Sequence, residues 1–381
     1  MISSAFRRLP GAVCVGCCVV ALAHCAARGA EKRPSWGACL SQPRQWYASS
    51  EAVRIADNVL LYQRADGGWP KNIDMAKPLD EKAVLSLRAE KRRHDSTVDN
   101  GATYTQMRYL ARVHSATGIP RFKAGFLRAM DLLLRAQYPS GGWPQFLVNP
   151  TGYQRYITFN DGAMIGVMSL LRDVALGKPD FEFVDPQRRR AASKAVARGV
   201  ECILKCQIRV NGTLTAWCAQ HDPKTFEPRP ARSYEKASLS GCESVGIVRF
   251  LMELDQPSPA VVEAVQSAVR WFDAVKLLGI RQVIRRDPTK PRGFDKFIVQ
   301  DPHAPPLWAR FYEIGTNRPI FCSRDGVVRY RLADISYERR TGYAWYGTWP
   351  ARLLARDYPA WQKRWAPGKN VLTRGQGPPR R

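Results

Sequence analysis

The chain has 381 residues, of which 45% are hydrophobic and 24% charged, and its 59 Lys and Arg outweigh 33 Asp and Glu to give a net charge of +26. This balance is typical of a globular protein and excludes a disordered chain or a coiled coil. At about 150 residues per domain, a chain of this length would form two domains, although a single helical or barrel domain is often longer than that. Such a basic surface attracts polyanions, whether nucleic acid, anionic membrane or acidic polysaccharide.

Residues 1–30 have the pattern of a secretory signal peptide: arginines, then an apolar run over residues 11–23, then small residues. The run is shorter than the roughly 20 residues that span a bilayer. We therefore expect a secreted or periplasmic protein with no integral membrane segment in the mature chain. Because His24 before Cys25 fits a lipoprotein signal poorly, we favour export without a lipid on Cys25. The leader contains no acidic residue, so its removal leaves the basic excess in the folded part.

The rest of the chain reads as mostly helical. Apolar residues at helical spacing predict helices over Val53–Arg64, Tyr104–His114, Phe122–Ala136, Ala163–Val174, Ala191–Cys206, Ser244–Leu254 and Pro259–Leu277. Strand-like stretches are short and occur late, at Val283–Ile284, Phe297–Val299 and Val327–Arg331. The cysteines after the leader include Cys202 and Cys206, whose spacing on a helix allows them to approach each other. Without a Cys-x-x-Cys pair, we expect buried packing cysteines rather than a zinc site.

A turn with a common pattern recurs three times. Leu60–Pro70 and Leu133–Pro144 each contain the end of a helix, a glutamine, a Gly-Gly turn and Trp-Pro, and a weaker copy runs from Ile203 to Trp217. Glycine caps the end of such a helix, and proline prevents its restart. A second helix follows each turn, so the chain contains three helix pairs. They predict a mainly α fold, an (α/α)3 toroid or barrel with a loop-rich, strand-poor C-terminal segment; an irregular helical bundle is the alternative.

The second helix of each pair starts with polar residues. Asp99 and Asn100 precede the first, Asp161 precedes the second, and Glu243 begins the third. Each one taken alone is an ordinary helix cap. If the toroid places these starts at one rim, their oxygens converge and could hold calcium, which takes six to eight oxygen ligands.

Arginines near the same rim form a second group of candidates. Arg232 leads into the third inner helix, and Arg318 lies in the loop-rich C-terminal segment. The planar guanidinium suits bidentate binding of a carboxylate. The alternative is that Arg232 pairs with Glu235 and Arg318 with Glu313 as structural ion pairs.

These blocks, in this order, resemble the polysaccharide lyase family 10 pectate lyases. The similarity runs from Ser50 to Trp365. It includes the two Gly-Gly-Trp-Pro turns and, among others, the blocks Thr97–Thr103, Tyr156–Ala163, Ala231–Glu235, Ser238–Gly246, Tyr312–Arg324 and Gly342–Tyr346. The resemblance implies secreted enzymes with an (α/α)3 toroid that cleave polygalacturonate by calcium-dependent β-elimination. It further implies a role for each matching residue: Asp99 and Asp161 bind Ca²⁺, Arg232 is the catalytic base, and Asn100, Arg318 and Arg324 bind substrate.

The expected organisation is a signal peptide at 1–30, a linker at 31–49, a catalytic toroid at 50–366 and a basic tail at 367–381. We expect a monomer that acts on polygalacturonate and has no nucleic-acid partner, since no zinc finger, RNP-like block or helix-turn-helix pattern is visible. A glycoside hydrolase that uses two carboxylates among Asp99, Asp161 and Glu243 is the first alternative. A non-catalytic polyanion-binding protein is the second.

Overall fold

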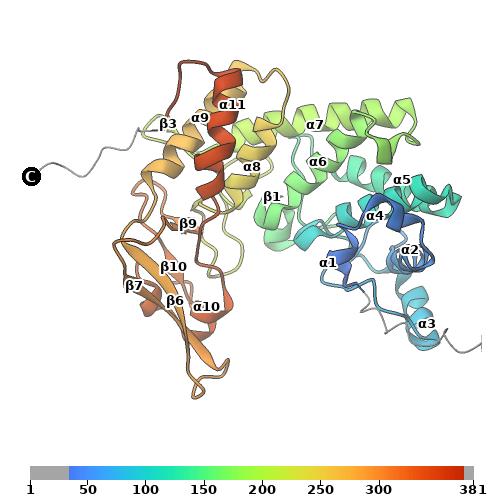
Figure 1. Ribbon diagram of the computed structural model, residues 1–381, viewed down its shortest axis with the longest axis horizontal. Coiled ribbons are helices and arrows are strands. Elements are labelled where there is room, and N and C mark those ends of the chain that lie inside the picture. The colour runs from blue at the N-terminus through green and yellow to red at the C-terminus, as the bar shows by residue number, and fades with distance from the viewer. Residues whose placement is uncertain (1–33, 373–381) are drawn as a thin grey trace, which may run out of the picture. The chain divides into compact units, whose positions relative to one another are not determined.

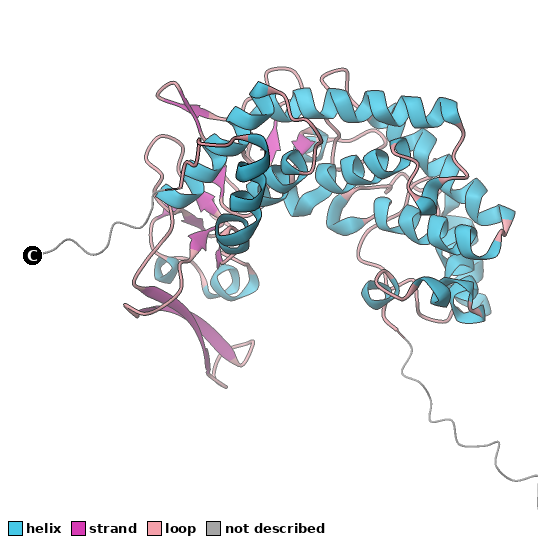
Figure 2. Ribbon diagram, turned by 45° about the horizontal axis from the view of Figure 1, so that its top comes forward, coloured by secondary structure: helices cyan, strands magenta, loops and turns pink. Residues whose placement is uncertain are grey.

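The computed structural model describes residues 34–372. The predicted signal peptide, with Cys25, and residues 373–381 of the predicted tail lie outside the described residues. The described part is mainly helical, and most of its short antiparallel strands lie in the segment from Ile280 onward (Figures 1 and 2). No helix in residues 34–372 has the length and apolar character required to cross a membrane.

Seven helices form two layers within the described residues. The outer layer contains α2 (Ser50–Tyr62), α5 (Pro120–Ala136), α7 (Pro186–Cys206) and α9 (Pro259–Ala274). The inner layer contains α4 (Tyr104–Thr117), α6 (Ala163–Ala175) and α8 (Glu243–Met252). Neighbours within each layer are in contact, and each inner helix packs on the outer helix that follows it in the chain. The predicted α/α toroid class is thereby confirmed, and the described helices do not form a closed barrel.

The remaining helices lie around these layers. They are α1 (Trp36–Cys39), α3 (Glu81–Ala89), α10 (Tyr337–Gly342) and α11 (Tyr358–Trp365). From Ser35 onward the segment predicted as a linker is not a linker, because α1 and the following turn bury Cys39 and Tyr47 in the main core. Of the cysteines in the described residues, Cys39, Cys202, Cys206, Cys218 and Cys322 are buried, as predicted, and Cys242 is partly buried.

The strands form antiparallel pairs that join distant parts of the chain. The pairs are β1 (Ile157–Thr158) with β4 (Gln220–His221), β2 (Arg209–Val210) with β3 (Thr213–Leu214), β5 (Leu239–Ser240) with β9 (Phe311–Tyr312), β6 (Ile280–Arg286) with β7 (Phe294–Gln300), β8 (Trp308–Ala309) with β12 (Tyr346–Gly347) and β10 (Phe321–Cys322) with β11 (Val328–Arg329). The β6–β7 hairpin is longer than predicted. Its sequence lacks the alternation of a half-buried strand, and Ile284 and Phe297 are exposed.

The recurring turns are held by the same hydrogen bonds in each copy. The carboxamide of Gln137 donates to the carbonyl of Gly141 in its own turn and to that of Ala195 in the next outer helix, both at 2.8 Å. The indole N–H of Trp143 donates back to the carbonyl of Leu133 at 2.8 Å. Gln63 with Trp69, and Gln207 with Trp217, repeat both contacts. Each turn is therefore fastened to the next outer helix.

The third copy of this turn differs in one contact. In the first two copies an arginine of the next outer helix donates to the side-chain oxygen of the glutamine: Arg128 to Gln63, and Arg198 to Gln137. Each arginine lies three residues after the residue whose carbonyl the glutamine binds. The corresponding position in α9 is Ser267, and the side-chain oxygen of Gln207 is buried without a hydrogen-bond partner in residues 34–372. In the third copy, whose sequence is the most divergent, the glutamine thus keeps its two donated bonds and lacks the arginine that binds its side-chain oxygen.

The close approach at Gly141 predicts a large steric cost for any side chain there. A Cβ at Gly141 would lie 2.1 Å from the carbonyl oxygen of Arg198, and its φ is +94°. Gly152, with φ +54° and open space around it, is the matched control. We expect Gly152→Ala to cost about 1 kcal/mol from φ alone and Gly141→Ala to cost about 3 kcal/mol or more. Denaturant unfolding measures both free energies. Equal costs would contradict the steric restriction that the Arg198 carbonyl places on position 141.

Candidate active site

Two equivalent turns carry the predicted aspartates. The turn Asp99–Gly101 leads into α4, the turn Asn160–Gly162 leads into α6, and the two turns are in contact. The middle residue of each turn, Asn100 or Asp161, has a left-handed backbone with φ of 50° or 49°, a conformation that Asn and Asp tolerate. The two turns that carry Asp99 and Asp161 therefore lie next to each other.

Asp99 is buried and only half satisfied. One of its carboxylate oxygens accepts a bond from the ammonium of Lys71. The other oxygen, Oδ1, is buried and has no hydrogen-bond partner in the described part of the chain. The neighbouring Asn100 donates from Nδ2 to Oδ1 of Asn72 at 2.9 Å. Since a buried unpaired carboxylate oxygen is costly, Oδ1 of Asp99 is suited to a further cation.

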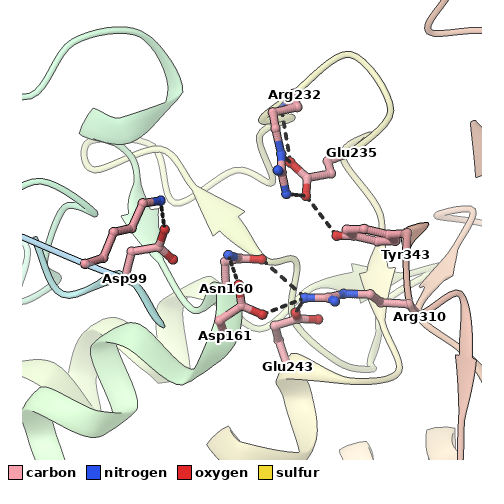
Figure 3. Close-up of polar contacts among 9 residues, drawn as sticks. Asp99, Asn160, Asp161, Arg232, Glu235, Glu243, Arg310 and Tyr343 are labelled. Carbon is pink, nitrogen blue, oxygen red and sulfur yellow. Dashed lines mark hydrogen bonds and ion pairs between the residues drawn. The ribbon is translucent and has the colours of Figure 1, made fainter. Parts of the chain in front are cut away.

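Asp161 belongs to a cluster centred on Arg310 (Figure 3). The Nη2 group of Arg310 contacts Oδ1 of Asp161 at 3.1 Å and also bonds Oε1 of Glu243. Its contact with the side-chain oxygen of Asn160 is longer, at 3.4 Å. Glu243 also accepts from the hydroxyl of Ser240, so the third helix start contributes an ion-pair partner for Arg310.

Strand pairing explains how Arg310 reaches this place. Its carbonyl accepts from the N–H of Gly241 at 2.9 Å, and its own N–H donates to the carbonyl of Trp345 at 2.7 Å. Burial alone would lower the pKa of the Arg310 guanidinium, but the charge of Glu243 dominates and the pKa is raised. Arg310 therefore stays a cation in the interior, and its guanidinium lies 4.8 Å from the ring centroid of Tyr343.

Arg232 is bound edge-on by Glu235. Its Nε donates to Oε2 of Glu235 at 2.8 Å and its Nη2 to Oε1 at 2.5 Å, so the predicted ion pair is confirmed. The hydroxyl of Tyr343 donates to the same Oε1 at 2.8 Å. Glu235 is 5% exposed, whereas the side chain of Arg232 is about half exposed. Its bond to Glu235 raises the pKa of Arg232.

Contacts run without interruption from Asp161 to Arg232. Arg310 bonds Asp161 and stacks on Tyr343, whose hydroxyl bonds Glu235, which in turn holds Arg232. Figure 3 shows the two groups of polar contacts with Tyr343 between them. Burial alone would raise the pKa of Glu235, but the hydrogen bond and charge of Arg232 dominate and hold that pKa below its usual value.

The other predicted arginines have different surroundings. Arg324 is exposed, pairs with Glu338 at 3.1 Å and lies 5.7 Å from the ring of Tyr234, on which Arg232 also packs. Arg318 is exposed and stacks 3.6 Å from the ring centroid of Tyr330. The side chain of Glu313 accepts bonds from Tyr330 and Thr316. The backbone N–H of Glu313 donates to the carbonyl of Arg318 at 2.9 Å, but among the described residues their side chains do not form the ion pair that the sequence suggested.

Sequence reasoning missed three of the residues that organise this site. Lys71 follows directly after the first Trp-Pro turn, and Tyr343 falls in a block that carries the family resemblance. Arg310 precedes β9 and had no local signal. Its partners lie 67 and 149 residues away, so only the tertiary structure brings them together.

The donor chemistry of the two aspartates suits a hard cation. In the described residues no group of three or more His, Cys, Asp or Glu side chains is placed to hold a metal ion. Asp99 and Asp161 offer two carboxylates from adjacent turns, and Oδ1 of Asp99 lacks a partner among the described residues. A cation bound there would need its remaining ligands from water, from Asn100 or from a bound anion.

A cavity of about 270 Å³ adjoins the first of the two turns, Asp99–Gly101. Its walls include Lys71, Asn72, Asn100, Thr105 and Gln106. Ammonium, amide and hydroxyl groups of this kind hydrogen-bond the carboxylates and hydroxyls of sugars.

Similar proteins share this architecture. The family model described as pectic acid lyase matches residues 63–354. The family 10 polysaccharide lyase from Cellvibrio cellulosa is 34% identical, with a TM-score of 0.68 over 82% of this chain and 94% of that one. A point mutant of that enzyme in complex with trigalacturonic acid is also 34% identical, with a TM-score of 0.71 over 84% of this chain and 96% of that one. Among curated proteins no match was found. The chain belongs to the pectic acid lyase family and is a pectate lyase of the family 10 type.

Proposed function

We propose that this pectate lyase is exported and cleaves polygalacturonate by calcium-assisted β-elimination with Arg232 as the base. The observation that supports it most is the contact between the turns that carry Asp99 and Asp161, together with the continuous contacts that run from Asp161 to Arg232. The similar enzyme in complex with trigalacturonic acid supports the choice of substrate. The net charge of +26 suits a polyanionic substrate.

Asp99 and Asp161 would hold the calcium, with Asn100 beside them. Calcium supplies Lewis-acid stabilisation of the uronate carboxylate, which makes the neighbouring C5 proton more acidic. Lys71 and Arg310 meanwhile balance the charge of the aspartates and fix their orientation. Arg318 and Arg324 are exposed cations that would bind further carboxylates of the polymer.

Arg232 would remove the C5 proton. The C5–H bond breaks as an N–H bond forms on the guanidine, and the electron pair forms the C4–C5 double bond. The bond from C4 to the glycosidic oxygen breaks as this double bond forms, and the oxygen takes a proton from water. Only the neutral guanidine can accept the proton, and its bond to Glu235 raises the pKa of Arg232.

The hydrolase alternative needs a carboxylic acid that donates a proton. Asp99 pairs with Lys71, while Asp161 and Glu243 pair with Arg310. Each of the three carboxylates thus faces a cation, which is the opposite of the apolar surroundings that favour a proton donor.

Turnover of polygalacturonate tests the proposed chemistry. With calcium, we expect products that absorb in the near ultraviolet, because β-elimination leaves a C4–C5 double bond next to the carboxylate. We expect EDTA to abolish the signal and added calcium to restore it. Reducing ends that form without this absorbance would indicate hydrolysis, and activity insensitive to EDTA would contradict the role of calcium.

The pH profile tests the base. The pKa of Arg232 is raised, so the neutral form is scarce at pH 7 and becomes more abundant as the pH rises. We therefore expect kcat in calcium-saturated buffer to increase about tenfold per pH unit above neutrality until the base is deprotonated or the protein unfolds. A flat profile or an acidic optimum would rule out Arg232 as the base.

A further inference from the structure

Glu235 occupies one edge of the Arg232 guanidinium and leaves the other edge open. Its two carboxylate oxygens accept from Nε and Nη2 of Arg232, and Nη1 takes part in neither bond. We propose that Glu235, held by Tyr343, is a positioning residue that makes Nη1 of Arg232 the nitrogen that accepts the substrate proton. This inference rests on the proposed function, because it assumes that Arg232 is the base.

The carboxylate of Glu235 is fixed from several directions. Oε2 accepts from Nε of Arg232 and from its backbone N–H, at 2.8 and 3.2 Å. Oε1 accepts from Nη2 of Arg232 and from the hydroxyl of Tyr343, at 2.5 and 2.8 Å. Backbone bonds from Glu235 N–H to the Arg232 carbonyl and from Ala231 N–H to the Glu235 carbonyl close the turn. With four donors on two oxygens and little exposure, this side chain has no free direction to turn.

The bonding pattern determines which nitrogen can lose a proton at least cost. A guanidine that lacks a proton on Nη1 still carries N–H groups on Nε and Nη2, so both bonds to Glu235 survive. Loss of the proton from Nε converts a donor into an acceptor that faces a carboxylate oxygen, and loss of a proton from Nη2 leaves one imine N–H, a weaker donor, to bond Oε1. The geometry of Glu235 therefore favours the neutral form in which Nη1 is the base, and the C5 proton is transferred to that atom.

Two arginines near Arg232, Arg324 and Arg339, oppose Glu235, and both are paired with Glu338. Tyr234 and Tyr343, in contrast, act on the pKa of Arg232 in the same direction as Glu235. The guanidinium of Arg232 lies 4.8 Å from the ring centroid of Tyr234, and two further arginine guanidiniums lie around the same ring. Nearby cations disfavour a protonated guanidinium, whereas Glu235 favours it. The titratable and charged groups that surround Arg232 are Glu235, Tyr234, Tyr343, Arg324 and Arg339.

Glu235→Gln tests the inference, since it removes the charge while keeping the shape of the side chain. We expect a lower maximal kcat, because the guanidinium of Arg232 is no longer held in one orientation. We also expect the pH-dependent rise of kcat to occur about one pH unit lower, because Arg232 loses its anionic partner. Below the pKa of the base in both proteins the ratio of variant to wild-type kcat should be constant, and it should fall only where the variant's profile levels off, at a lower pH than that of wild type. A variant profile that levels off at the same pH as wild type, or keeps rising beyond it, would mean that Glu235 is merely structural and would overturn the inference.

Asp295→Asn is the matched control. Asp295 is 3% exposed and accepts from Nε and Nη2 of Arg340 at 2.8 and 2.7 Å, the same pairing in a different place. We expect the kcat of this variant to stay within about twofold of wild type, and the pH at which its kcat rises to be unchanged. An equal shift in this variant would mean that the change is global and would also overturn the inference.

Tyr343→Phe covers the case in which Glu235→Gln does not fold. It removes the hydroxyl that holds Glu235 and keeps the ring beside Arg310. We expect kcat to fall about 5- to 10-fold with KM changed less than twofold, and no shift of the pH-dependent rise of kcat to lower pH, because the charge of Glu235 remains. An unchanged kcat would contradict the positioning role. A wild-type protein that forms no unsaturated product would instead contradict the proposed function.

Discussion

The carboxamide of a buried glutamine is the contact on which this fold depends. Gln63, Gln137 and Gln207 each bond a carbonyl of their own turn and a carbonyl of the next outer helix. Every turn is thereby fixed against its neighbour, and the inner helix that follows starts from a defined place. This explains how residues as far apart as Asp99 and Asp161 come to adjacent turns at one rim. The chemistry of the rim is therefore a consequence of three repeated amide contacts.

Charge balance is the second constraint. Each carboxylate at the site faces a cation of the same chain: Lys71 for Asp99, Arg310 for Asp161 and Glu243, and Arg232 for Glu235. These pairs allow acidic groups to be buried without a bound ion. They leave Oδ1 of Asp99 and Nη1 of Arg232 outside the paired contacts. The many other basic residues give the protein an overall positive field, and this small set provides the chemistry.

Local pattern was enough for the helices and for part of the site. The period of apolar residues located α5 and α6 to within a few residues, and the Gly-Gly-Trp-Pro turns predicted the paired layers. The pairing of Arg232 with Glu235 is local, so spacing suggested it. Arg310 and Tyr343 could not be placed in the same way, because strand pairs between β5 and β9 and between β8 and β12 bring them to the site. Helix α3 was missed because it is short and buries only Leu87.

A crystal structure of the Arg232→Lys variant with calcium and trigalacturonate tests the central claim most directly. The account predicts that one calcium ion contacts both Asp99 and Asp161 and a sugar carboxylate, with C5 of that sugar facing the side chain at position 232. It also predicts that Arg310, Tyr343 and Glu235 keep the contacts they have now. A cation bound away from the two aspartates, or a sugar whose C5 faces away from residue 232, would contradict it.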